Sequence, residues 1–279
     1  MSNKFGEIFK KVASEKKTHL SERKLLKNIR KGFENQEFKM YLQFIVDSKQ
    51  GKIASAETLS RWENSLGEVV FPGSYIGIME RSGLITMFDY YMFEKVCLKL
   101  SQWKDSELSN VSLSCNLTRI TISEKDFAEK IKEISSKYDF DRSKLIIEIT
   151  EDSLEKNLVV AMLNIIEIKK LGFRISLDDF GSGYTSFVSL CEYPIDVVKI
   201  DREILLLSGT EKGKKLFFGI VSLAHFLNLK VVCEGVETEE QRRLVVESGC
   251  DYIQGWYYSK ALSEENAEKF AIDYMNKIL

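Results

Sequence analysis

The sequence predicts an α/β fold, a TIM-like (β/α)8 barrel in which one strand is antiparallel. Short β-rich runs alternate with helical patterns along the chain of 279 residues, which is typical of a parallel sheet with crossover helices. There are eight such runs, the number of strands that closes a barrel of this kind. Only residues 48–52 separate the first two runs. A parallel crossover needs a longer connection, so we expect these two strands to be antiparallel.

The predicted strands are short runs rich in apolar and β-branched residues. They cover residues 38–47, 53–61, 111–117, 144–150, 174–179, 197–201, 230–235 and 252–256. Several of the predicted helices begin with Ser, Thr or an acidic residue and end at or near a glycine, as at Leu171-Gly172, and these are the usual capping residues. The helices cover residues 86–104, 123–137, 155–171, 183–192, 212–227, 238–248 and 263–278.

Composition favours one large domain after a short leader. The chain is long enough, and at 44% hydrophobic residues apolar enough, to bury a substantial core. No Ser/Gly-rich linker follows residue 36, and no internal repeat is present. We therefore expect a basic helical leader or linker over residues 1–24 and a single domain over residues 25–279.

Charge is distributed unevenly along the chain. Residues 1–35 hold ten Lys or Arg against four Asp or Glu, a charge of +6, so the remainder carries −8 in a chain of net charge −2. An acidic body gives no support to DNA binding. The leader mixes apolar residues with lysines, as amphipathic helices do. It fits either the end of a linker from an upstream regulatory or sensor domain, or a docking surface.

Five cysteines are present, widely separated and without C-x-x-C spacing, which argues against a disulfide framework and predicts a reducing, cytoplasmic setting. No signal peptide stands at the start. The longest apolar stretch, Leu216 to Leu229, is interrupted by polar residues and is too short to span a bilayer. We expect a cytoplasmic protein with no transmembrane segment in this chain.

Six of the eight strands end in a carboxylate, an amide or a lysine. In barrels of alternating strands and helices, the strand ends on one face hold the active site. The residues are Glu57, Asn116, Glu148, the pair Asp178 and Asp179, Lys199 with Asp201, and Glu234. This pattern predicts one enzyme site assembled from scattered segments.

Five carboxylates among them, those of Glu57, Glu148, Asp178, Asp179 and Glu234, would repel one another at one barrel mouth unless they were protonated or bound to cations. The candidate ligands are all oxygen donors, and the only histidines are His19 in the leader and His225 within a predicted helix. The sequence thus favours Mg²⁺ or Mn²⁺ over a histidine-based zinc or iron site. Two such ions bridged by Asp178 can activate a water for in-line attack on a phosphodiester. Lys199, aimed at the same mouth, can orient that water or stabilise developing charge.

Each motif also has a purely structural interpretation. An Asp-Asp pair followed by Phe180-Gly181-Ser182-Gly183 is, taken alone, more often a turn with a helix cap than a metal site. Glu57 with Arg61, or Lys199 with Asp201, fits an ordinary surface ion pair. Their joint recurrence at strand ends favours a shared site over these separate explanations.

The same segments resemble the EAL-domain family, bacterial phosphodiesterases that open cyclic di-GMP to the linear dinucleotide pGpG. The resemblance covers nearly the whole chain from about Leu25 onward, and its elements occur in the family's order. They are Glu57-Thr58-Leu59-Ser60-Arg61-Trp62, Asn116-Leu117-Thr118, Glu148-Ile149-Thr150-Glu151-Asp152-Ser153, Asp178-Asp179-Phe180-Gly181-Ser182-Gly183-Tyr184, Val198-Lys199-Ile200-Asp201, Glu234-Gly235-Val236-Glu237-Thr238 and Gln254-Gly255.

The resemblance implies a role for each matching residue. One metal would be bound by Glu57, Asn116, Glu148 and Asp178, and a second by Asp178, Asp179 and Glu234. Catalysis beside the nucleophilic water would fall to Lys199, Glu234 and Asp179. The substrate site would comprise Gln43, Leu59, Arg61, Asp201, Glu237 and Gln254, with Arg61 as the phosphate contact. Glu151 would steady the loop from Phe180 to about Ser189, which in the family links metal binding to dimer contacts.

The chain departs from the family pattern at a few positions beside the site. Thr58 stands where the family usually has alanine, and Phe44 where it has proline. Cys233 replaces a common alanine, and Ala261 a proline. None of these departures removes a candidate ligand, whereas Thr58 and Phe44 neighbour the Glu57 strand and the expected guanine contact.

The resemblance implies a cyclic-guanylate-specific phosphodiesterase of bacterial second-messenger signalling, a homodimer that uses two Mg²⁺ or Mn²⁺ ions per site. Calcium is expected to inhibit, because its longer bonds and looser geometry position a water poorly. One alternative is a catalytically weak or inactive domain that acts as a cyclic di-GMP receptor or a protein-interaction module. Another alternative is an enzyme that hydrolyses a different phosphoester. The presence of Arg61 and Gln254, which match the family's substrate site, argues against this alternative.

Overall fold

The computed structural model describes residues 22–150, 159–181 and 187–278. Two compact units make up the chain. The larger comprises Met40–Leu59 and Thr86–Leu279, and the smaller comprises the chain up to Lys39 together with Ser60–Ile85.

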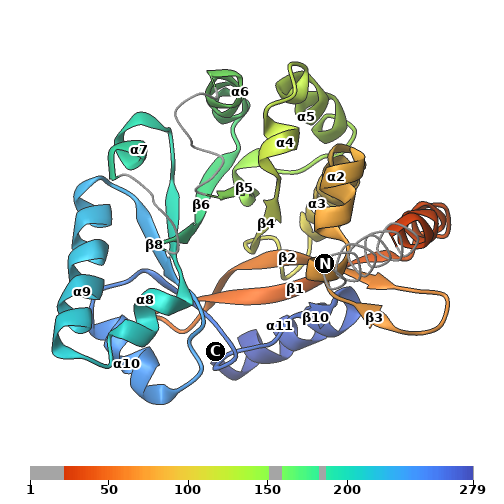
Figure 1. The fold of residues 1–279 in the computed structure, drawn as a ribbon. Helices are drawn as coiled ribbons and strands as arrows, with labels where there is room; N and C mark the ends of the chain where they lie inside the picture. Colours follow the sequence, from red (N-terminus) through yellow and green to blue (C-terminus); the bar gives the residue numbers. More distant parts are fainter. Residues whose placement is uncertain (1–21, 151–158, 182–186, 279) are drawn as a thin grey trace, which may run out of the picture. The chain divides into compact units, whose positions relative to one another are not determined.

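Eight strands, formed mainly by residues of the larger unit, close into a barrel (Figure 1). Neighbouring strands follow the order β1-β9-β8-β7-β6-β5-β4-β2, and pairing of β1 with β2 completes the ring. The strands are β1 Phe38–Asp47, β2 Ile53–Glu63, β4 Ser112–Asn116, β5 Leu145–Thr150, β6 Arg174–Phe180, β7 Val197–Ile200, β8 Lys230–Cys233 and β9 Tyr252–Gln254. The predicted TIM-like barrel is therefore confirmed.

Strand β1 is the antiparallel member of the barrel. It pairs antiparallel with β9, where Ile45 lies opposite Gln254. Each remaining neighbour pair from β9 round to β2 is parallel. A tight turn joins β1 to β2, with the Asp47 nitrogen donating to the Lys52 carbonyl at 2.8 Å. This short connection is what predicted the reversed direction.

Helices lie around the outside of the barrel (Figure 1). They are α3 Ile85–Trp103, α4 Arg119–Ile122, α5 Phe127–Ser135, α6 Val159–Lys170, α7 Phe187–Glu192, α8 Arg202–Leu207, α9 Glu211–Phe226, α10 Glu239–Glu247 and α11 Glu264–Ile278, with the 3-10 turn η2 Arg142–Lys144. The short strand β10 Leu262–Ser263 pairs with β1. The sequence missed α4 and α8, and the predicted starts of α6 and α7 lie outside the described residues.

Strand alternation divides the barrel core into an outer apolar set and an inner, partly polar set. On β5, Ile147 is fully buried, whereas its neighbour Glu148 lines a cavity inside the barrel. On β6 the same alternation places Leu177 in the apolar set and Ser176 at the cavity. Side chains two residues apart share one face of a strand, so polar groups at every second position meet inside the barrel.

The smaller unit contains a helix over residues 22–34, the end of β2, β3 Val69–Val70, η1 Pro72–Ser74 and α2 Ile76–Ser82. Its core is aromatic: the Phe38 ring lies 5.5 Å from the rings of both Trp62 and Tyr75. The Trp62 indole also donates to Glu37 at 2.8 Å. Most of the predicted leader, residues 1–24, lies outside the described residues. Among those described, no helix has the length and apolar character needed to cross a membrane.

A buried aspartate on α3 fixes the chain that leaves β4. The Asp89 carboxylate oxygen Oδ2 accepts hydrogen bonds from the Thr118 nitrogen at 2.9 Å, the Thr118 hydroxyl at 2.7 Å and the Thr121 hydroxyl at 2.6 Å. Thr118 follows Asn116 by two residues, and it is the N-terminal cap of α4. Asp89 therefore sets the position of the strand end that carries a candidate ligand.

We expect Asp89→Ala to lower the free energy of unfolding by roughly 2–4 kcal/mol, because it leaves three donors without their charged acceptor. Urea denaturation of the purified chain measures the change. Asp105→Ala, at an exposed aspartate, is the matched control and should stay within about 0.5 kcal/mol of the parent. Equal stability of the two variants would contradict the role given to Asp89.

Candidate active site

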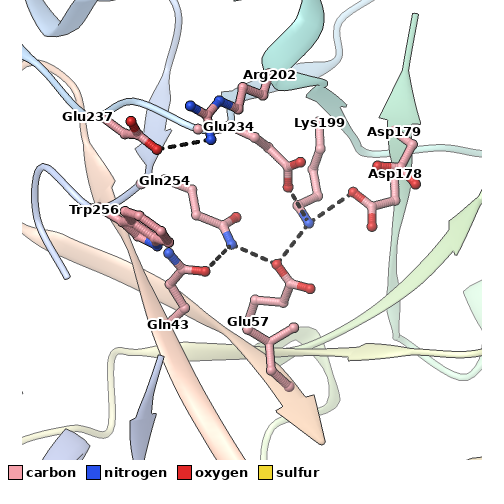
Figure 2. A pocket seen from close by; sticks show the side chains of 13 residues that line it. Gln43, Glu57, Asp178, Asp179, Lys199, Arg202, Glu234, Glu237, Gln254 and Trp256 are labelled. Carbon is pink, nitrogen blue, oxygen red and sulfur yellow. Dashed lines mark hydrogen bonds and ion pairs between the residues drawn. The ribbon is translucent and has the colours of Figure 1, made fainter. Parts of the chain in front are cut away.

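The Lys199 ammonium group lies at the barrel mouth among carboxylates from four other strand ends, of which Figure 2 shows those of Glu57, Asp178 and Glu234. Its Nζ atom is 2.6 Å from Glu234 Oε1, 2.9 Å from Asp178 Oδ1, 3.1 Å from Glu57 Oε2 and 3.4 Å from Glu148 Oε1. The lysine side chain is buried. One positive charge thus faces four acidic groups in a site with little access to water.

Glu57 is held by a line of side-chain amides. Its Oε1 atom accepts from Asn116 at 2.9 Å, and its Oε2 atom accepts from Gln254 at 2.6 Å. The Gln254 amide also donates to Gln43 at 3.3 Å, and Gln43 in turn donates to the Ser259 carbonyl at 3.2 Å. Because Asn116 donates through its nitrogen, its amide oxygen is the atom suited to coordinate a cation.

A backbone irregularity brings Asp178 and Asp179 to the same pocket. Consecutive residues of a regular strand point to opposite faces, but β6 shifts register against β7 between Leu177 and Phe180. Asp179 has a φ of 56°, a left-handed conformation that aspartate tolerates better than most residues. Both carboxylates consequently line the pocket. Local strain of this kind concentrates at functional sites.

The candidate metal ligands fall into two groups that share Asp178. One group joins Glu57, Glu148 and Asp178, and the other joins Asp178, Asp179 and Glu234. In each, one oxygen from every member lies within 4.8 Å of the others. The sequence resemblance implied these same two sets, with Asn116 added to the first.

Burial and mutual repulsion shift the pKa values of these groups. Burial, with the charges of Asp178 and Glu57, raises the pKa of Glu234 to about 8 against the lowering effect of Lys199. Partial burial and the charge of Asp178 raise the pKa of Asp179 to about 6. Burial also lifts the pKa of Glu148 well above its usual value. One ammonium group therefore does not neutralise the cluster.

Glu57 behaves differently because its partners outweigh its burial. Burial alone would raise the pKa of Glu57, but the charge of Lys199 and the hydrogen bonds from Gln254 and Asn116 bring it below its usual value. The same carboxylates hold the pKa of Lys199 well above normal, although burial acts in the opposite direction. In the ion pair between Lys199 and Glu57, both side chains are therefore stabilised in their charged forms.

The remaining negative charge fits a divalent cation. The donors are carboxylate and amide oxygens, which suit Mg²⁺ and Mn²⁺. Among the described residues, no hydrogen-bond donor reaches the buried Oε2 atom of Glu148. A buried anionic oxygen without a partner is costly, and either a bound cation or an ordered water molecule would offset that cost for this group.

A pocket of about 340 Å³ opens beside the acidic cluster, a size in the range of small-ligand sites. Gln43, Leu59, Glu237 and Gln254 line it, as the resemblance implied. Two further residues that were not predicted from the sequence, Arg202 and Trp256, also line the pocket (Figure 2). Their positions in the sequence could have revealed them, because Arg202 directly follows Lys199-Ile200-Asp201 and Trp256 directly follows Gln254-Gly255.

These two residues give the pocket a cation and an aromatic surface. Arg202 pairs with Glu237 at 2.9 Å, and about half of the Arg202 side chain stays exposed. Trp256 is 60% exposed, and the Lys260 ammonium lies 4.8 Å from the centre of its ring. An exposed indole offers a stacking surface for a base, and a guanidinium group suits a phosphate.

Asp201 and Arg61 are not among the residues that line this pocket. Asp201 accepts from the Glu203 nitrogen at 2.7 Å and caps α8, the helix that begins with Arg202. Arg61 belongs to the smaller unit, where it donates to the Ser60 carbonyl and lies over the Phe71 ring. Glu151 and residues 182–186 of the loop from Phe180 to Ser189 lie outside the described residues.

The two departures from the family pattern nearest the site are packed into the structure. The Thr58 hydroxyl donates to the Ser114 carbonyl at 2.5 Å, which ties β2 to β4 next to Glu57. Phe44 is fully buried and stacks on Phe270, with ring centres 5.5 Å apart. Neither side chain lines the pocket.

Comparison with known proteins assigns the family. Residues 26–261 match the model of the EAL domain. The signaling protein YkoW of Bacillus subtilis is 32% identical over 246 residues, 88% of this chain and 31% of YkoW. The cyclic di-GMP phosphodiesterase PdeR of Escherichia coli is 27% identical over 251 residues, 90% of this chain and 38% of PdeR.

A solved structure gives the same result. The PaMucR phosphodiesterase in complex with c-di-GMP matches with a TM-score of 0.82 and 27% identity, over 88% of this chain and 99% of that one. This chain belongs to the EAL-domain family. It spans about a third of the length of the curated relatives YkoW and MucR.

A glycine allows two pocket loops to lie against each other. The Val236 nitrogen donates to the Gln254 carbonyl at 3.2 Å, and the Tyr257 nitrogen donates to the Val236 carbonyl at 3.0 Å. A Cβ atom on Gly255 would overlap the Val236 backbone. The close approach therefore requires glycine, and it keeps the loop after β8 beside Gln254.

We expect Gly255→Ala to destabilise the chain by about 1–3 kcal/mol, the usual cost of overpacking, because backbone has to move. Thermal unfolding checks this. Gly219→Ala serves as control, since it lies in α9 with no atom close to its added methyl group and should keep or raise stability. Unfolding of both variants at the parent's temperature would show that the backbone at Val236 does not require glycine at position 255.

Proposed function

We propose that this chain is a metal-dependent phosphodiesterase that hydrolyses cyclic di-GMP to linear pGpG. The observation that carries the proposal is the pair of acidic groups sharing Asp178 at the barrel mouth, next to a pocket of about 340 Å³. PdeR, a family relative, is named a cyclic di-GMP phosphodiesterase. PaMucR, a structural neighbour, is a phosphodiesterase seen in complex with c-di-GMP.

The proposed metal ligands are Glu57, Asn116, Glu148 and Asp178 for one ion, and Asp178, Asp179 and Glu234 for the other. Two Mg²⁺ or Mn²⁺ ions held there would supply the Lewis-acid charge for attack of water on a phosphodiester. The chain's own groups prepare the site for this. Amide hydrogen bonds orient Glu57, and the bulge at Asp179 turns both aspartates toward the same space.

Lys199 is the proposed catalytic cation of the protein itself. Its ammonium is kept charged by four carboxylates within 3.4 Å, so it can hold an attacking water and stabilise charge that develops on phosphate. Glu234 and Asp179, both with raised pKa values, are the carboxylates proposed to act beside it.

The pocket residues suit a dinucleotide with two phosphates and two bases. Arg202 provides a guanidinium for phosphate, and Trp256 provides an exposed ring for stacking. Gln43 and Gln254 present amides to base edges, while Glu237 and Asp201 hold Arg202 and its helix in place. Arg61 is proposed as a further phosphate contact on the strength of the sequence resemblance.

The proposal extends to the rest of the chain's organisation. Residues 25–279 would form the catalytic domain and act in the cytoplasm, with a regulatory or sensor domain preceding them in the polypeptide. Glu151 would steady the loop after Asp179.

A homodimer is supported by large apolar side chains that are exposed on two packed helices: Ile120 on α4, and Val159, Val160 and Leu163 on α6. Sedimentation of the chain as a monomer at high concentration would contradict the dimer.

Chromatography of cyclic di-GMP incubated with the purified chain tests the function. We expect pGpG to form with Mg²⁺ or Mn²⁺, and no product with EDTA. Calcium should bind and compete without supporting turnover, because it tolerates longer bonds and looser geometry. Intact nucleotide in every metal, with binding retained, would instead favour the receptor or protein-interaction function.

Glu57→Ala should lower turnover by more than about a hundredfold. Removing a residue that only hydrogen-bonds a metal ligand costs up to about a hundredfold, and removing the ligand itself should cost more. The matched control is Thr58→Ala on the same strand, whose side chain hydrogen-bonds only the Ser114 backbone among the bonds identified and which should keep or raise activity. Rates of pGpG formation at saturating Mn²⁺ measure both. Full activity of Glu57→Ala would defeat the metal assignment.

A further inference from the structure

Three of the strands that carry candidate ligands have a serine two residues earlier, at Ser55-x-Glu57, Ser114-x-Asn116 and Ser176-x-Asp178. Residues two apart share a strand face, so these serines lie one step deeper in the barrel than the acidic cluster. We call Ser55, Ser114 and Ser176 the serine layer. TIM barrels usually fill such a layer with bulky branched side chains, and small polar residues leave space.

That space is a cavity of about 40 Å³ beneath the acidic cluster. The serine layer forms one side of it, and Ile45, Val197 and Val232, a buried apolar cluster, form the other. Glu148 and Lys199 also line it. The cavity has room for about one to three water molecules.

Three buried polar atoms at this cavity have no hydrogen-bond partner among the described residues: Ser114 Oγ, Ser176 Oγ and Glu148 Oε2. Strand register brings two of them together, since Glu148 on β5 lies beside Ser176 on β6. Ser114 is fixed on the other side of β5, opposite Ile146. The unpaired atoms therefore come from three adjacent strands, β4, β5 and β6, around one space.

Leaving three buried polar atoms without partners would cost a large part of a domain's net stability. Internal water typically fills polar cavities where it can make two to four hydrogen bonds. Two serine hydroxyls, each able to donate or accept, and one carboxylate oxygen meet that requirement. We infer that the serine layer holds ordered water that donates to Glu148 Oε2, and that Ser114 and Ser176 are positioning residues for this carboxylate.

The consequence for the site is mechanical. Glu148 approaches Lys199 through its Oε1 atom at 3.4 Å, and its Oε2 atom is the end that the water would fix. Outer partners of this kind fix the orientation of metal ligands. This consequence rests on the proposed metal site, whereas the water itself depends only on the cavity and its three polar atoms.

The test compares two double variants of nearly equal shape. Ser114→Val with Ser176→Val removes both hydroxyls, and Ser114→Thr with Ser176→Thr adds similar bulk but keeps them. Calorimetric titration with Mn²⁺ in the absence of nucleotide measures metal affinity, and thermal unfolding checks that each variant folds. We expect the valine variant to lose about 10- to 100-fold in Mn²⁺ affinity and the threonine variant to lose less than about tenfold.

Wild-type affinity in the valine variant would overturn the inference, as would equal losses in both variants, because bulk alone would then explain the effect. A high-resolution crystal structure of the unsubstituted chain tests for the water directly and does not depend on whether the variants fold. Water within hydrogen-bond distance of Ser114 Oγ, Ser176 Oγ and Glu148 Oε2 supports the inference, and an empty cavity overturns it. Failure of the proposed function would look different: the parent chain would bind no Mn²⁺, or bind it without forming pGpG, while the cavity kept its water.

Discussion

Electrostatic repulsion among carboxylates is the constraint on which the rest of this site depends. Four acidic side chains lie within 3.4 Å of one lysine ammonium, and a fifth, Asp179, adjoins them. One positive charge stabilises one carboxylate well, as the lowered pKa of Glu57 and the raised pKa values of Glu148 and Glu234 show. The remaining negative charge must be neutralised by protons or by cations. Because the carboxylate oxygens form two groups, bound cations fit this site.

The barrel brings these charges together by strand alternation and by one local exception to it. Side chains at every second position face the interior, so strands distant in sequence deliver Glu57, Glu148 and Lys199 to one place. The bulge on β6 breaks the alternation and adds Asp179 to the side of Asp178. The same alternation puts small serines below the ligands, where the interior is neither fully apolar nor fully packed.

Much of this architecture could be predicted from the sequence because the relevant signals are local. The five-residue connection after β1 fixes the antiparallel strand, and carboxylates at strand ends mark the site. Helices α4 and α8 were missed because four to six residues carry too little periodic pattern. Arg202 and Trp256 enter the pocket through loop geometry, and the positive φ of Asp179 depends on pairing with β7, so residue type alone does not reveal them.

The most direct test of the central claim is anomalous diffraction from crystals of the chain grown with Mn²⁺. The account predicts two manganese peaks at the barrel mouth, both in contact with Asp178, one near Glu57 and Glu148 and the other near Asp179 and Glu234. It would be contradicted by the absence of manganese at these residues while Lys199 kept its four carboxylate partners, because the lysine and protons would then be sufficient to neutralise the cluster.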